Sequence, residues 1–277
     1  MSRVQLRANV ILLVSALFLW ATPAFAQGPT ERLPDKDVKK LIDLVDDGRD
    51  KFEGNLDGKF KNSTFRGPTG ETNISNLLKD YEDNTKKLKD RFNDDYAASA
   101  EVATVLTRAA TIDEFMKTTS PVMKGRSEWD AEMASLKYLA GAYGATFPLP
   151  QGATVRRMND KETAAAAEAI AKAADRFKDD LDKVTTLAKA DKEAAKKDVE
   201  LLIKQANDIK DRTSDGKPST AAVRQLVEQA ARLQTFVGAH PMPSAMADWQ
   251  TVQASLGKVQ QAFGLTEKEE TEPPSRV

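Results

Sequence analysis

Apolar residues recur at intervals of three and four along most of the chain, which is the spacing of one face of an α-helix. One stripe runs from position 38 to 56, and a second runs from 102 to 116. A third, at positions 129, 133, 136, 140 and 143, alternates steps of four and three. Alternation with a period of two, which would indicate strands, is nearly absent. The pattern therefore predicts an all-α protein.

The two halves of the chain carry the same pattern. Asp35 matches Asp160 at an offset of 125 residues, and Trp129 matches Trp249 at an offset of 120. The offset changes only near positions 62–70 and again after Met116, where loops are expected. Stripes that stay in register across such gaps indicate an internal duplication, although Ala/Lys/Asp-rich helices can also align with one another by chance.

Each half predicts four helices. They are expected near 35–60, 73–92, 97–118 and 121–144 in the first half, and near 160–189, 192–212, 219–238 and 243–264 in the second. Capping residues support these boundaries; they are Ser120 before Pro121, Ser219, Ser244, Gly144 and Gly264. Amphipathic helices joined by short loops favour an up-down-up-down antiparallel four-helix bundle, here in tandem.

The first residues carry the three parts of a secretory signal peptide. Arg3 and Arg7 give a positive start, Val10–Trp20 is an apolar run of suitable length, and Ala24-Phe25-Ala26 is an A-x-A cleavage site. An uncleaved N-terminal anchor is the alternative. No cysteine follows the run, which excludes a lipoprotein anchor. The sequence therefore predicts a periplasmic or secreted protein with no membrane span after cleavage.

These signals divide the chain into six segments. They are a signal peptide (1–26), an N-terminal lead (27–34), a first bundle repeat (35–145), a linker (146–158), a second bundle repeat (159–265) and an acidic, disordered tail (266–277). The linker is marked by Pro148, Pro150 and Gly152, which are turn and loop residues. The tail carries prolines and glutamates and few apolar residues, a composition typical of disorder.

Composition excludes several chemistries. Loss of residues 1–26 leaves 39 Lys and Arg against 42 Asp and Glu, a charge of about −3, which gives no footprint for nucleic acid or anionic lipid. The chain has no cysteine, so disulfides, thiolate nucleophiles, iron–sulfur clusters and covalent haem are excluded. His240 is the single histidine, which excludes His-based di-iron and His/Cys zinc sites.

Two features invite a cofactor interpretation. His240 could ligate b-type haem together with a methionine, but its position in a turn favours a solvated residue at a helix entry. In the second half an Ala-rich face at 164–174 replaces larger side chains of the first, so that Leu41, Ile42 and Gly48 become Ala166, Ala167 and Ala173. This face indicates either close helix packing, which we favour, or a cavity.

The remaining candidates favour structural roles. The clusters Asp43–Asp50 and Asp175–Asp182 lie on predicted helices that also carry lysines, and they show no calcium-loop pattern, so they are expected to be salt-bridged surface. Trp129 with Tyr143, and Trp249 with Phe263, share a helix face and are expected in the core rather than at a ligand. A hydrolase would need two carboxylates facing each other in a pocket, and the apolar stripes predict no buried pair.

The hypothesis that fits these constraints is an exported, non-enzymatic helical binding or interaction module of the cell envelope. It assigns no catalytic or metal residues and no cofactor, and its partner is a protein or a small ligand in the periplasm. The alternative is a carrier of a small hydrophobic ligand or haem in a bundle core, like a b-type cytochrome. The partner and the oligomeric state stay open.

Overall fold

The computed structural model describes residues 31–67, 70–119 and 123–265. The predicted signal peptide, the predicted tail and the predicted cap at Ser120-Pro121 lie outside these residues. Within the described part the chain forms nine helices and one two-stranded hairpin, so the all-α prediction is confirmed. No helix in these ranges is both long enough and apolar enough to cross a membrane.

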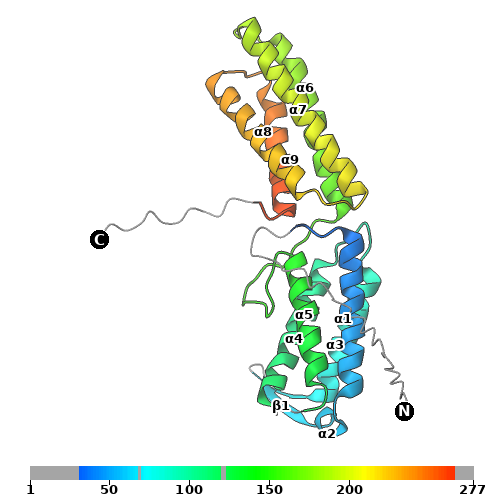
Figure 1. Ribbon diagram of the computed structural model, residues 1–277. Coiled ribbons are helices and arrows are strands. Elements are labelled where there is room, and N and C mark those ends of the chain that lie inside the picture. The colour runs from blue at the N-terminus through cyan, green and yellow to red at the C-terminus, as the bar shows by residue number, and fades with distance from the viewer. Residues whose placement is uncertain (1–30, 68–69, 120–122, 266–277) are drawn as a thin grey trace, which may run out of the picture. The chain divides into compact units, whose positions relative to one another are not determined.

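Four helices of the first half pack around one hydrophobic core (Figure 1). They are α1 (Asp35–Asn55), α3 (Ile74–Arg91), α4 (Ser99–Thr118) and α5 (Arg126–Ala142). Helix α1 contacts α3 and α5, and α4 contacts the same two helices, so the four helices close a ring. Phe52, Tyr81, Leu106 and Trp129 are fully buried inside it. We call this group the first helix set.

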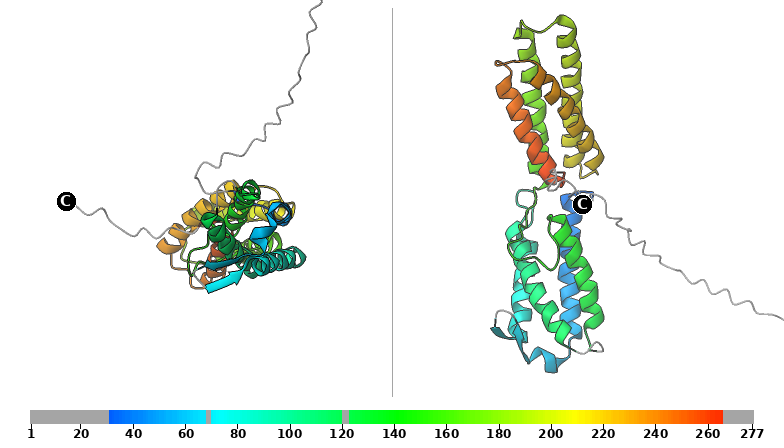
Figure 2. Two further views of the ribbon diagram at one scale, coloured as in Figure 1. Left: turned by 90° about the horizontal axis from the view of Figure 1, so that it is seen from below. Right: turned by 90° about the vertical axis from the view of Figure 1, so that its left-hand side faces the viewer.

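Four helices of the second half form a second ring around a separate core (Figure 2). They are α6 (Asp160–Lys183), α7 (Lys189–Ser214), α8 (Thr220–Ala239) and α9 (Met246–Ala262). Helix α6 contacts α7 and α9, and α8 contacts the same two helices, which repeats the contact order of the first set. Phe177, Leu202, Leu226 and Trp249 lie at its centre. We call this group the second helix set.

The predicted helices are present at nearly the predicted positions. All but one begin within three residues of the predicted start, and the exception is α5, which begins at Arg126 rather than 121. Gly144 and Gly264 follow α5 and α9 in the left-handed conformation, with φ of 66° and 63°, as expected of helix-terminating glycines. Ser219 precedes α8 without a side-chain capping bond, and the predicted cap at Ser244 is wrong because Ala245 occupies that position.

The segment after α1 is not the loop that the sequence predicts. A short helix α2 (Gly58–Lys61) leads into an antiparallel hairpin of β1 (Thr64–Gly67) and β2 (Gly70–Asn73). Strands of four residues are too short to show a clear alternation, which explains the wrong prediction. Phe65 of β1 packs edge-on against Phe115 with ring centroids 5.8 Å apart, so the hairpin covers one end of the first core.

The N-terminal ends of α1 and α6, together with an arginine that precedes each, exchange matching bonds. The backbone N–H of Asp35 donates to the carboxylate of Asp160 (2.8 Å), and the N–H of Asp160 donates to that of Asp35 (2.6 Å). Arg32 pairs with Asp160, and Arg157 pairs with Asp35. Each arginine and each aspartate matches its counterpart at the predicted offset of 125. Asp35 is 6% exposed, whereas the side chain of Asp160 is 18% exposed, and neither lies on the apolar stripes, for which the sequence predicts no buried carboxylate pair.

The Ala-rich face of α6 lies inside the second core. Ala167, Ala173 and Ala174 have no exposed surface, and α6 contacts both α7 and α9. Small side chains let helix backbones approach one another, so this burial is what close packing on alanine requires.

Candidate functional site: a hollow between α1 and α5

Three residues of the first core differ in chemistry from their counterparts in the second. Gly48 of α1, Tyr81 of α3 and Glu132 of α5 meet inside the first helix set, and we call them the polar trio. At the offsets of their segments, 125, 121 and 120, they match Ala173, Leu202 and Val252, the apolar trio. All three members of the apolar trio are fully buried, as an ordinary helical core requires.

The carboxyl group of Glu132 is buried and only half satisfied. The residue is 1% exposed, and its Oε1 accepts a hydrogen bond from the Tyr81 hydroxyl. Its Oε2 is also buried but has no hydrogen-bond partner. Leaving a buried polar atom unpaired costs about 1–3 kcal/mol, and native proteins do so rarely.

Gly48 provides the space that Glu132 occupies. A Cβ atom built on Gly48 would lie 2.1 Å from Oε2 of Glu132, far inside the contact distance. Glycine weakens a helix interior by roughly 1 kcal/mol relative to alanine, and the matching position in α6 is Ala173. The glycine therefore does not stabilise α1, and its structural effect is to make room for the buried carboxyl group of Glu132.

Burial also changes the ionisation of the trio. It raises the pKa of the Glu132 carboxyl from 4.5 to about 8, although the Tyr81 hydroxyl and the Arg49 guanidinium act to lower it. Burial and the neighbouring Glu132 raise the pKa of Tyr81 well above 10. At neutral pH the pair is therefore a protonated carboxyl group beside a phenol, and both become charged only at alkaline pH.

Charged residues surround the trio on the α1 side. The guanidinium of Arg49 is 2% exposed and pairs with Asp46 at 2.7 Å and Asp50 at 2.8 Å. Lys89 of α3 bridges Asp43 and Asp46 at 3.0 and 3.1 Å. These ion pairs confirm the prediction that the aspartates of α1 form a salt-bridged face.

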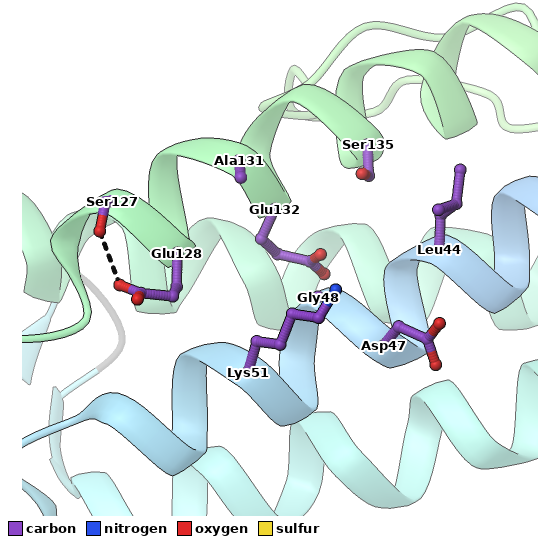
Figure 3. Close-up of a pocket in the computed structure, with 9 residues that line it drawn as sticks. All are labelled: Leu44, Asp47, Gly48, Lys51, Ser127, Glu128, Ala131, Glu132 and Ser135. Atoms are coloured by element: carbon purple, nitrogen blue, oxygen red, sulfur yellow. Dashed lines mark hydrogen bonds between the residues drawn. The ribbon is translucent and has the colours of Figure 1, made fainter. Parts of the chain in front are cut away.

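A hollow of about 410 Å³ lies over the trio, between α1 and α5 (Figure 3). Leu44, Gly48 and Lys51 of α1 line it on one side, and Glu128, Ala131 and Glu132 of α5 line it on the other. Figure 3 shows the Glu132 side chain directed across the hollow toward Gly48, and Ser127 bonded to Glu128. Its volume is within the range of small-molecule sites.

The aromatic cluster beneath the hollow is common to both helix sets. Trp129 packs on Phe52 with centroids 4.9 Å apart, and Trp249 packs on Phe177 at 5.4 Å. The indole N–H of Trp129 donates to Asp113 (3.1 Å), whose counterpart at an offset of 121 is Gln234. The indole of Trp249 donates to that glutamine (2.6 Å). Both tryptophans are buried, which confirms the prediction that they belong to the core.

The other predicted candidates do not lie at the hollow. His240 follows α8, where its Nδ1 lies 2.9 Å from the carbonyl oxygen of Phe236 and its ring packs on that phenylalanine. Within the described ranges, no cluster of three or more His, Asp or Glu side chains is placed to hold a metal ion. What the hollow offers is an open space beside a carboxyl group that is hydrogen-bonded at one oxygen only, which is chemistry for binding a hydrogen-bond donor.

Sequence reasoning missed Glu132 for a definable reason. It lies beside Met133, the residue that continues the apolar stripe from Trp129 to Leu136. A charged residue next to a stripe is usually at the surface. The signal that could have identified it is the internal alignment, in which Glu132 matches Val252 in an otherwise similar helix.

Comparison with protein-family models, with curated proteins and with solved structures found no match to this chain.

Proposed function

We propose that this chain is an exported, non-enzymatic binding module built as a tandem duplication of an up-down-up-down antiparallel four-helix bundle. The first bundle binds a small ligand in the hollow between α1 and α5, and the second is an apolar counterpart of the same design. The boundaries proposed from the sequence, 35–145 and 159–265, each enclose one helix set, and the first core also includes Phe147 of the proposed linker.

Several matched features support the duplication. The two helix sets have the same order of contacts, and α5 and α9 end at matching glycines. Each set buries a phenylalanine–tryptophan pair and gives the indole N–H an acceptor at the matching position of the preceding helix. Chance alignment of Ala/Lys-rich helices would match helix faces, but it would not match indole acceptors.

The single observation that carries the binding role is the contrast between the polar trio and the apolar trio. A buried, unpaired carboxyl oxygen and a helix glycine both destabilise the first bundle. The second bundle shows that the same frame accommodates Ala173, Leu202 and Val252 instead. Local departures from good core design are typical of functional sites, and here Gly48 and Glu132 both line one hollow, while Tyr81 bonds to Glu132 from inside the core.

Export is proposed from the N-terminal sequence. The positive start, the apolar run and the A-x-A motif belong to residues 1–26, and cleavage after Ala26 would leave Gln27 as the new N-terminus. In the periplasm or outside the cell, a chain without cysteines relies on its hydrophobic cores for stability, and the two helix sets supply two such cores.

Native mass spectrometry of the protein purified from the periplasm of a bacterial host tests this proposal. We expect an N-terminus at Gln27 and a mass above that of the polypeptide, because a bound small molecule is retained. Gly48→Ala should remove the added mass, and the matched variant Ala173→Gly should keep it. An added mass that persists in Gly48→Ala, or a polypeptide without any added mass, would contradict a site at the hollow.

An absorbance spectrum of the same sample tests the alternative carrier. A Soret band, lost in Ala167→Ile, would place haem at the Ala-rich face of α6 and would replace the present proposal. The burial of Ala167 inside the second core favours the opposite outcome.

A further inference from the structure

We propose that the ligand of the hollow is a short alkylammonium cation, whose ammonium group bonds to Oε2 of Glu132 and whose aliphatic part lies against Leu44 and Ala131. This inference rests on the proposed function, because it identifies the chemical class of ligand for the same site.

The unpaired oxygen of Glu132 defines which group is missing. Oε2 is an acceptor buried at the boundary of the hollow, and Tyr81 already satisfies Oε1 of the same carboxyl group. An external N–H donor would complete the hydrogen bonding, and a charged donor makes the stronger bond with a carboxylate. Gly48 has no Cβ atom, which lets Oε2 itself lie against α1 at the wall of the hollow.

The charges that line the hollow favour a cation. Asp47 and Glu128 contribute carboxylates, Glu132 contributes a carboxyl group that is protonated in the free site, and Lys51 contributes the one ammonium group among the lining side chains described. An anion would meet this excess of carboxylates and would be repelled. A neutral donor would gain a hydrogen bond but not the charge complementarity.

The non-polar part of the lining suits a short carbon chain. Leu44 is 57% exposed, which is unusual for a leucine on a helix whose other leucine is buried, and it stands at the rim of the hollow. Ala131 on α5 is also exposed and lies on the other side. Methylene groups laid between them would remove apolar surface from water on both helices.

Binding of such a cation should be coupled to the release of a proton from Glu132. An ammonium group favours the ionised carboxylate, whereas the free site holds a proton because the pKa of Glu132 is raised to about 8. Binding at pH 7 should therefore release about one proton from this group. The charged and titratable groups that act on Glu132 are Tyr81 of α3 and Arg49 and Asp46 of α1. The other ionisable side chains at the same hollow are Asp47 and Lys51 of α1 and Glu128 of α5.

Isothermal titration calorimetry of the full chain with 1,4-diaminobutane tests the inference. We expect saturable binding at pH 7, with a heat that differs between phosphate and Tris buffers by the ionisation heat of about one proton. The uncharged analogue 1,4-butanediol should bind at least tenfold more weakly. Equal binding of the diamine and the diol, or a heat that is the same in both buffers, would overturn the inference.

Two variants connect the signal to the trio. Glu132→Gln should weaken diamine binding at least tenfold and abolish the buffer dependence. Gly48→Ala should weaken it because the methyl group would displace the carboxyl group, whereas the matched control Ala173→Gly should bind as the unchanged chain does. If Glu132→Gln fails to fold, Gly48→Ala with its control decides. Diamine binding unaffected by either variant would contradict the inference.

The two proposals can fail separately. No diamine binding, together with a native mass that Gly48→Ala reduces, would overturn the alkylammonium class and leave the hollow as the site of another ligand. No diamine binding and no added mass would overturn both.

Discussion

The helices of the first and second sets contact one another in the same order, yet different residues fill the core beside the tryptophan in the two sets. In the second set Ala173, Leu202 and Val252 fill it with apolar groups. In the first set a glycine, a phenol and a carboxyl group occupy the matching positions, with one oxygen left unpaired. The frame therefore does not require the polar trio, and its presence in one set alone points to a role in that set.

On the proposed duplication, one helix set keeps an apolar core for stability, while the other carries the proposed binding site. Replacing buried polar groups by well-packed apolar groups of similar volume is often neutral or stabilising. The second set has that apolar arrangement, so we expect it to be the more stable of the two around its tryptophan. The variants below either remove what the sets share or convert one trio toward the other.

The largest effect is expected from removing the tryptophan of either set. Trp129→Ala and Trp249→Ala each delete a fully buried side chain and should lower the free energy of unfolding by about 3–5 kcal/mol. The loss should be greater for Trp129, because its removal also takes the indole donor from buried Asp113. Urea titration gives the magnitude, and hydrogen exchange resolved by peptide should show faster exchange mainly within the altered set. Faster exchange spread equally over both sets would mean that they unfold as one unit.

The second largest effect is a pH dependence specific to the first set. Between pH 4.5 and about 8 the folded state keeps a proton on Glu132 that the unfolded state has lost, so unfolding releases a proton and rising pH favours it. The stabilisation from this group is complete below pH 4.5 and falls by about 1.4 kcal/mol per pH unit up to about pH 8, a loss on the order of 5 kcal/mol in all.

Glu132→Gln supplies the matched control for that dependence. The difference in unfolding free energy between the unchanged chain and Glu132→Gln, measured in urea from pH 5 to pH 8, should decrease steadily as pH rises. A difference that does not change with pH would show that Glu132 is ionised in the folded protein and that its pKa is not raised.

Gly48 and Glu132 should show strong coupling, which is the third prediction. Gly48→Ala alone should destabilise the chain, because the new methyl group would overlap Oε2 of Glu132. In the Glu132→Val background the same change should stabilise by roughly 0.5–1 kcal/mol, since alanine is the better helix former. A coupling of about 1–2 kcal/mol in this double-mutant cycle is expected.

The second set provides the reference for this cycle. Ala173→Gly should lower the free energy of unfolding by roughly 1 kcal/mol, the ordinary difference in helix propensity, because the matching residue Val252 has no polar group that needs space at that position. Additive effects of Gly48→Ala and Glu132→Val on the free energy of unfolding would mean that the carboxyl group of Glu132 does not need a glycine at position 48.

The sequence predicted the shared features of the two sets and missed what distinguishes them. The burial of Trp129 and Trp249 follows from helical periodicity, because a large apolar residue on the apolar stripe of a helix faces the core. Glu132 is buried because Gly48, 84 positions earlier, leaves room for it and because Tyr81 on a third helix donates to it. Such a site depends on contacts between distant residues, which local patterns do not contain. The hairpin was missed for the opposite reason, since its strands are too short to form a pattern.

The smallest effect is expected where the two sets use different residues for the same purpose. Asp113 and Gln234 both accept the indole N–H of their tryptophan, one through a carboxylate and the other through an amide. Asp113→Asn keeps an acceptor oxygen and loses the pair with Lys117, which is 55% exposed, so thermal or urea unfolding should show a loss below about 1 kcal/mol. Asp113→Ala leaves the indole N–H without an acceptor and should cost about 1–3 kcal/mol. Equal losses in the two variants would show that the charge matters rather than the hydrogen bond, and that the amide of Gln234 is not its equivalent.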